Sequence, residues 1–162
     1  MNFVDQKNEG QGKITYPNGD IYHGDLVNDL AHGYGRYLHK DGGVYEGFWL
    51  NNKQHGFGKE LWADGNFYNF IIIESFYKGE YKVGVKEGQG IYEWSQGVRY
   101  EGDWKNNEMH GWGVFFNDDE KYEGEFIDGV YDGNGRLVES SGEIYEGRFR
   151  DGMKHGIGTI IS

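Results

Sequence analysis

The pair Gly-x-Gly recurs along the whole chain at an almost constant interval. It stands at positions 10/12, 33/35, 56/58, 88/90, 111/113, 133/135 and 156/158, so successive steps are 23, 23, 32, 23, 22 and 23 residues. A second motif, Tyr-x-Gly, recurs with it from Tyr22 to Tyr145. A fixed period of this length is the signature of stacked copies of one supersecondary unit. We therefore expect a repeat protein, in which each unit contacts its neighbours, rather than a fold around one central core.

Residues alternate at period two within each unit. Tyr45, Gly47 and Trp49 are expected to face one way, while Glu46 and Phe48 face the other, which is a strand pattern. No segment sustains the 3.6-residue period of a helix. A six-residue loop, as in 106–111, is expected to join the two strands of a unit. Tight hairpins between units are predicted at Asn18-Gly19, Asp41-Gly42, Asp64-Gly65 and Ser141-Gly142.

Glycine and aromatic residues are both abundant, with 29 Gly and 17% aromatic residues. A single hairpin cannot bury a face, but stacked hairpins can. The glycine of Tyr-x-Gly stands between aromatics of one face, so it should let rings of adjacent repeats interleave. The expected fold is all-β: an elongated, single-layer antiparallel ribbon of six or seven β-hairpin repeats, each of about 23 residues.

Two stretches carry a resemblance to a known family. YEGFWLNNKQHGFGKELWADG, at 45–65, and YEGDWKNNEMHGWG, at 100–113, resemble MORN (membrane occupation and recognition nexus) repeats. The resemblance covers about residues 8–162. It implies a β-hairpin ribbon and a non-enzymatic scaffold, of the kind found in cytoskeletal, ciliary and membrane-junction assemblies.

The period divides the chain into four segments. Residues 1–9 are expected to form an N-terminal cap, and 10–67 to form repeats, of which the first is partial. The long step of 32 residues contains YNFIIIESF at 68–76, which we interpret as an insertion that breaks the array. It would form an extra strand or a bend, or alternatively an exposed contact site. Residues 77–162 are expected to form the remaining repeats.

The charge and the lack of cysteine restrict the partners. The net charge is −11, from 27 acidic and 16 basic residues, which repels phosphate and argues against nucleic acid. It also disfavours docking on anionic lipid. Without cysteine there is no disulfide framework and no thiolate metal site. Since no signal sequence is evident, we expect a cytoplasmic protein, and the resemblance implies an association with the cytoskeleton or a cilium.

Histidine recurs before Gly-x-Gly, at His32, His55, His110 and His155. Ligands of one metal ion lie within about 4 Å of each other, whereas equivalent atoms of neighbouring hairpins should be about 10 Å apart. We therefore expect no metal site and no cofactor, and a ring nitrogen bonded to loop backbone instead.

Glutamate recurs directly after the repeat tyrosine and predicts an acidic stripe of Glu46, Glu101, Glu123 and Glu146. The stripe is a solvated face or a surface for a basic partner. An acid-pair glycosidase is the enzymatic alternative, but identical surroundings give no reason for two different carboxyl pKa values. No catalytic residues are predicted, and the chain is expected not to be an enzyme.

A single-layer ribbon should leave part of its aromatic face accessible. We predict a partner-binding groove on that face for a peptide or helix with a basic or amphipathic segment, formed by Tyr45, Trp49, Tyr100, Trp104, Tyr122, Phe126, Tyr145 and Phe149. The alternative is a phospholipid-binding or membrane-apposed module. The last repeat ends in Ile157-Gly-Thr-Ile-Ile-Ser162 without a polar cap, which predicts end-to-end pairing into a homodimer or a docked partner. The alternative is a short, frayed edge.

Overall fold

The computed structural model describes residues 3–5, 9–63 and 75–162. The chain divides into two compact units, unit 1 at residues 1–85 and unit 2 at 86–162, which we describe separately. Antiparallel β-strands dominate both units, and the described residues contain no α-helix, only a 3₁₀ turn, η1, at Ser95–Gly97. None of their helical structure could cross a membrane. The predicted all-β hairpin-repeat class is confirmed.

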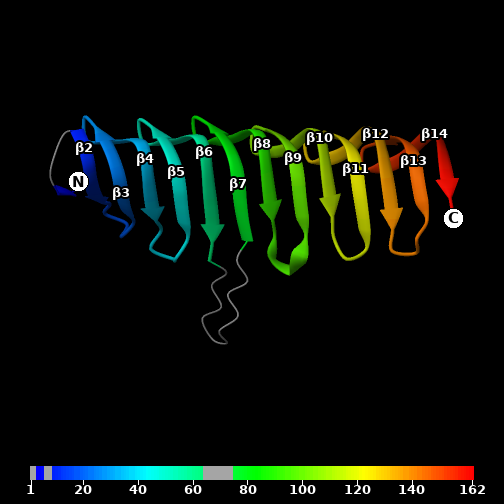
Figure 1. Ribbon diagram of the computed structural model, residues 1–162, viewed down its shortest axis with the longest axis horizontal. Helices are drawn as coiled ribbons and strands as arrows, with labels where there is room; N and C mark the ends of the chain where they lie inside the picture. Colours follow the sequence, from blue (N-terminus) through cyan, green and yellow to red (C-terminus); the bar gives the residue numbers. More distant parts are fainter. Residues whose placement is uncertain (1–2, 6–8, 64–74) are drawn as a thin grey trace. The chain divides into compact units, whose positions relative to one another are not determined.

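Within each unit, every strand pairs with the next one in the chain (Figure 1). Unit 1 holds β1 (Phe3–Asp5), β2 (Glu9–Thr15), β3 (Ile21–Val27), β4 (Leu30–Leu38), β5 (Val44–Leu50), β6 (Lys53–Trp62) and β7 (Ser75–Lys82). The strands of unit 2 are β8 (Val85–Glu93), β9 (Arg99–Lys105), β10 (Glu108–Phe116), β11 (Glu120–Ile127), β12 (Val130–Glu139), β13 (Ile144–Arg150) and β14 (Met153–Ile161).

Two of the predicted segments are only partly described. Ser75 and Phe76, which end the predicted insertion, belong to β7 and pair with Trp62 and Leu61 of β6. Residues 68–74 lie outside the described part of the chain. Within the predicted cap, β1 pairs with β2, with Val4 in register with Ile14.

A row of glycines crosses the strands of each unit. The glycine of Tyr-x-Gly pairs with the second glycine of Gly-x-Gly on both sides, as Gly102 does with Gly90 and Gly113. The repeat tyrosine lies over this row, and a Cβ added to Gly113 would be 2.5 Å from the hydroxyl oxygen of Tyr100. We call the face that carries the repeat tyrosines the inner face, and the opposite face of the same sheet the outer face.

The tyrosine hydroxyl is fixed by the backbone in every complete repeat. Tyr100 donates to the carbonyl of Asp103 at 2.7 Å, and the other five repeat tyrosines make the same bond to the residue three positions on, at 2.8–3.0 Å. The rings then interleave as predicted, because Tyr22 meets Trp49 of the next repeat edge-to-face at 5.3 Å and Tyr100 meets Phe126 at 5.0 Å. Such pairs contribute about 0.5–1.5 kcal/mol each beyond area burial.

The loop predicted within a repeat is wrong. β9 and β10 are joined by two residues only, Asn106 and Asn107, with φ of 49° and 69°. Asn51-Asn52 forms the same turn between β5 and β6. Positive φ at both central positions is typical of a type I′ turn, whose twist matches that of the strands it joins. The following His-Gly-x-Gly therefore lies inside a strand, where Gly111 has a φ of 60° at a β-bulge.

The hairpin connections between repeats are confirmed at three of the four predicted places. Gly19, Gly42 and Gly142 have φ of 95°, 100° and 88° in the loops that follow β2, β4 and β12. Asp64-Gly65 lies outside the described residues.

Candidate functional site

The eight aromatic side chains predicted to line a groove are all buried. Their exposed fractions run from 0% for Tyr45, Tyr100 and Tyr122 to 8% for Trp49, and the other four are Trp104, Phe126, Tyr145 and Phe149. They are the core of the repeats, because each ring is covered by the rings of its neighbours. The predicted accessibility of these rings is therefore corrected, and a partner on this face must contact other residues.

The inner face of unit 2 carries a second, half-buried row. Strand register places Met109 opposite Trp104, Phe115 opposite Tyr100, and Tyr131 opposite Phe126. Met109, Phe115 and Tyr131, together with Val130, Gly129 and Gly152, line a hollow of about 220 Å³. We call it the inner-face hollow. The lining residues of this hollow were not predicted, because they stand at positions that vary from one repeat to the next, whereas the prediction used the tyrosines that recur in every complete repeat.

Tyr131 is held firmly at the hollow. Its ring stacks on that of Tyr122 with centroids 3.8 Å apart, and its hydroxyl donates to Glu120 at 2.9 Å. Burial, followed by this bond to a carboxylate, raises the pKa of Tyr131. The hollow therefore has a rigid, neutral aromatic wall.

Acidic turn residues stand beside the hollow. Asp128 and Asp151 directly precede the lining glycines Gly129 and Gly152, and the Asp128 side chain is 75% exposed. The Nδ1 atom of His110 is 3.5 Å from the Asp128 carboxylate. An apolar floor with carboxylates at its edge suits a cationic amphipathic segment.

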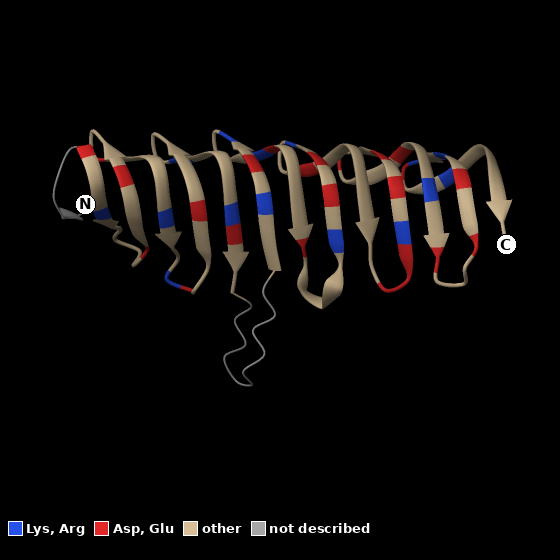
Figure 2. Cartoon of the chain, viewed as in Figure 1, with Lys and Arg blue, Asp and Glu red and all other residues tan. Residues whose placement is uncertain are grey.

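The predicted acidic stripe lies on the outer face of each unit: Glu46 in unit 1, and Glu101, Glu123 and Glu146 in one register row of unit 2. It is interrupted by cations and donors: Glu146 pairs with Arg136 at 2.9 Å, Glu101 pairs with Arg99 at 3.0 Å, and Glu46 accepts from the hydroxyl of Tyr34 at 2.8 Å. Glu123 lies opposite Arg136. Figure 2 shows acidic residues on β9, β11 and β13 and basic residues on β4, β6 and β7, with both kinds present on β6, β7, β9 and β11.

The in-register histidines contact the turn of the following repeat. His55 accepts a long bond, 3.4 Å, from the backbone N–H of Val83, as expected for a ring nitrogen on loop backbone. His32 instead faces the side chain of Asn51 at 3.4 Å, and His110 faces Asp128. His155 is exposed. Among the residues that the structure describes, no three His, Cys, Asp or Glu side chains come together as a metal site.

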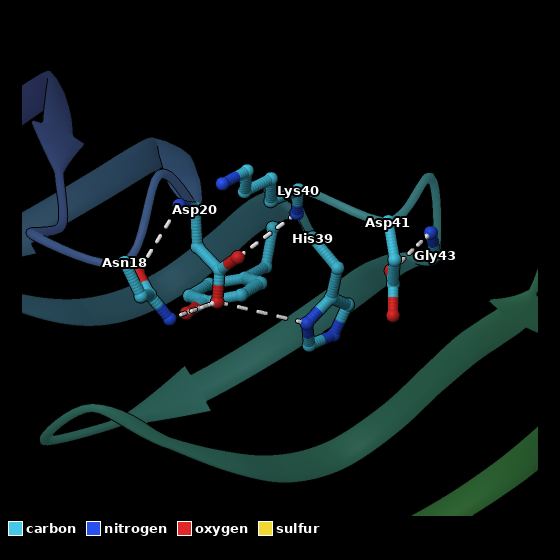
Figure 3. A network of polar contacts seen from close by, with 7 residues as sticks. Asn18, Asp20, His39, Lys40, Asp41 and Gly43 are labelled. Atoms are coloured by element: carbon cyan, nitrogen blue, oxygen red, sulfur yellow. Dashed lines mark hydrogen bonds and ion pairs between the residues drawn. The ribbon is translucent and has the colours of Figure 1, made fainter.

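One buried carboxylate, Asp20, links two successive loops (Figure 3). It accepts from the hydroxyl of Tyr37 at 2.7 Å, the backbone N–H of Lys40 at 2.9 Å and the amide of Asn18 at 2.7 Å. Those from Tyr37 and Lys40 are the main reason why the pKa of Asp20 is lowered. This cluster was not predicted from the sequence, in which its only sign is an acid after Asn18-Gly19. With these bonds made, Asp20 is a structural residue.

Comparison with known families gives one result. The family model described as MORN repeat matches seven segments, at residues 7–21, 22–44, 45–67, 77–99, 100–119, 122–142 and 145–162. Six of these begin at a repeat tyrosine, and the first covers only the partial unit before Tyr22. A search of curated proteins gave no match.

Proposed function

The chain belongs to the MORN repeat family, and we propose that it is a protein-interaction scaffold whose inner-face hollow holds a basic amphipathic segment. The MORN repeat is generally a non-enzymatic module, known in protein-interaction and membrane-associated proteins.

The observation that carries the proposal is the inner-face hollow with acidic turns at its edge. Val130 is 43% exposed beside Met109 and Phe115, which are half-buried. Exposed apolar surface with a polar rim is typical of interaction sites. A large apolar side chain of the partner would act as the anchor in this hollow, and anchors of this kind supply most of the binding energy.

The distribution of charge explains why the partner should be basic. Unit 2 contains 16 acidic and 8 basic residues, whereas residues 1–85 contain 11 and 8. The field of unit 2 therefore attracts cations, and it raises the rate at which a basic segment reaches the hollow.

A labelled basic amphipathic peptide of leucine and lysine tests the proposal by fluorescence anisotropy. We expect Val130→Asp to weaken binding about tenfold or more, because it places a carboxylate among the residues that line the hollow. Val27→Asp is the matched control, since Val27 is a similarly exposed valine next to a turn of unit 1. Asp128→Lys should weaken binding and reduce its dependence on salt. Equal affinities for Val130→Asp and the unmodified chain would contradict the proposal.

The cellular setting is the part of the proposal that rests on the family alone. We propose a cytoplasmic scaffold in a cytoskeletal or ciliary assembly, as the family resemblance suggests. Proximity labelling in the native cell would identify its neighbours. Flotation with anionic vesicles tests the alternative of a phospholipid-binding module, which the net charge of −11 disfavours.

End-to-end pairing remains a prediction for β14. Within the described residues this strand pairs with β13, and Ile157 is 95% and Ile160 60% exposed. An exposed apolar edge strand is a template for pairing with another chain. Sedimentation of the chain and of Ile160→Lys would test whether a dimer forms through this strand.

A further inference from the structure

The outer face of unit 1 carries a row of basic residues, although the net charge of the chain is −11. We infer that it is a second docking surface, which takes an extended acidic peptide segment. This inference goes beyond the proposed function, because it concerns the other unit, the opposite face of the sheet and a partner of opposite charge.

Strand register aligns the basic side chains in one row. Across β2 to β7 the paired positions are, in order, Lys13, His23, Arg36, Glu46, Lys59 and Lys78. We call these six residues the basic row. Neighbouring strands are about 4.8 Å apart, so the row is roughly 24 Å long, which about seven residues of an extended chain would span.

The cations of this row are available to a ligand. Arg36 and Lys78 are exposed, and the part of the chain that the structure describes offers them no ion pair or hydrogen bond. Lys59 is exposed and lies over the ring of Phe76 at 5.2 Å. The one acid of the row, Glu46, accepts a hydrogen bond from Tyr34. Carboxylates of a partner would therefore meet cations with little competition from the row itself.

Apolar side chains flank the basic row on both sides. Tyr34, Phe48 and Phe57 are 47%, 50% and 51% exposed, and with Glu46 and Lys59 they line a shallow hollow of about 250 Å³. On the other side, register aligns a half-buried apolar row of Ile21, Leu38, Val44, Leu61 and Phe76. A ligand seated on the cations would also bury apolar surface, which calls for an acidic segment that carries apolar side chains.

The same register row in unit 2 carries three acids and one cation. Relative to the glycine row, Glu101, Glu123 and Glu146 stand where unit 1 has His23, Glu46 and Lys78, and Arg136 is the one cation of a row that reads Ile91, Glu101, Val114, Glu123, Arg136, Glu146 and Thr159. The basic row is thus particular to unit 1. The row is one residue wide, which fits a peptide. An anionic bilayer or a nucleic acid is larger than the row and would also be repelled by the net charge of −11 on the chain.

The test uses the full chain and a fluorescein-labelled peptide of about twelve residues, long enough to span the row, with glutamates around two central leucines. We expect saturable binding by anisotropy that weakens with salt, and about tenfold weaker binding when the glutamates are replaced by glutamine. Arg36→Glu with Lys59→Glu should weaken binding by about tenfold or more, and Phe48→Ser by several-fold.

Arg136→Glu is the matched control, because Arg136 is an arginine of the same register row in unit 2. It and Val130→Asp, the variant at the hollow of unit 2, should each change the affinity less than about twofold. A circular dichroism spectrum for each variant checks that the sheet is intact. The inference is overturned if the glutamate and glutamine peptides bind equally, if Arg136→Glu weakens binding as much as the double variant, or if the chain binds anionic vesicles or single-stranded RNA in preference to the peptide.

Discussion

The repeat tyrosine and the glycine beneath it depend on each other at the scale of single residues. Tyr100 lies across Gly113, and its hydroxyl is fixed by the carbonyl of Asp103, so the ring cannot move away from the strand. The interpretation that glycine makes room for aromatic rings was correct. What the pattern could not tell is that the room is for the tyrosine of the same repeat, since this depends on register across two strands.

Gly113→Ala should destabilise the fold by about 2–3 kcal/mol, because the added methyl would overlap the Tyr100 ring. Gly129→Asn is the control: its φ of 84° tolerates asparagine and no atom lies near its Cβ position. We expect that variant to cost less than about 1 kcal/mol. Urea denaturation followed by circular dichroism measures both. Similar midpoints for the two variants would show that the ring can shift after all.

Tyr100→Phe isolates the hydroxyl from the ring. The buried hydroxyl donates to the carbonyl of Asp103 at 2.7 Å and also lies 3.3 Å from the carbonyl of His110, so its loss should cost about 1–2 kcal/mol. Tyr34→Phe removes an exposed hydroxyl from Glu46 and should stay within about 0.5 kcal/mol of the parent. The comparison is again made by urea denaturation, and equal losses would argue against a special role for the repeat hydroxyl.

Hairpins, the elements of this fold, were predicted better than the turns that close them. Alternation in Tyr45-Glu-Gly-Phe-Trp49 correctly predicted the inner and outer faces of β5, because the period of a strand is fixed at two. The turn was wrong because Asn-Asn was not recognised as a type I′ pair, although asparagine is among the few residues that tolerate positive φ. The bulge at Gly111 then made a strand look like a loop.

These turns also bind one repeat to the preceding one. The backbone N–H of Asn107 donates to the carbonyl of Lys86 at 3.1 Å, and its side-chain oxygen accepts from the N–H of Lys86 at 2.8 Å. Asn52 makes the same two bonds to Ala31, at 2.9 and 2.7 Å. A residue that accepts positive φ and also offers a side-chain acceptor is needed here, and asparagine satisfies both conditions.

Two substitutions at Asn107 separate these conditions. Asn107→Gly keeps the φ of 69° and loses only the side-chain bond, so we expect a loss of about 1 kcal/mol. Asn107→Ala also strains the backbone and should cost about 2–3 kcal/mol. Thermal or urea unfolding would rank the two variants. If alanine were as stable as glycine, backbone strain would not be the reason for asparagine at this turn.

For the whole molecule, composition predicted the sign of the charge but not its placement. A net charge of −11 describes neither unit well, since the basic row lies on unit 1 and most of the excess acid lies in unit 2. Composition cannot reveal this division, because which charges share a face depends on strand register. The accessibility of the predicted groove residues was wrong for a related reason. Alternation tells which face of the sheet a ring occupies, but not whether other rings cover it.

The large number of buried tyrosines makes the molecule sensitive to alkali. Burial raises the pKa of Tyr122 to about 12, and it is likewise the first cause of the raised pKa of Tyr22, Tyr45, Tyr77 and Tyr100. In the unfolded chain a tyrosine has a pKa of about 10. Above that pH the unfolded state binds fewer protons than the folded state, so the free energy of unfolding falls as pH rises.

We therefore expect stability to be unaffected by these tyrosines below about pH 10, and to fall by up to about 1.4 kcal/mol per pH unit for each phenol that ionises only on unfolding. Stopped-flow pH jumps should show tyrosinate absorbance for the buried rings rising together with the loss of the β-sheet circular dichroism signal. Tyr122→Phe should make the fall in stability less steep, although the variant begins less stable at neutral pH. If the buried phenols titrated near pH 10 while the sheet signal persisted, the rings would be open to water, which would contradict the aromatic packing described for the inner face of each unit.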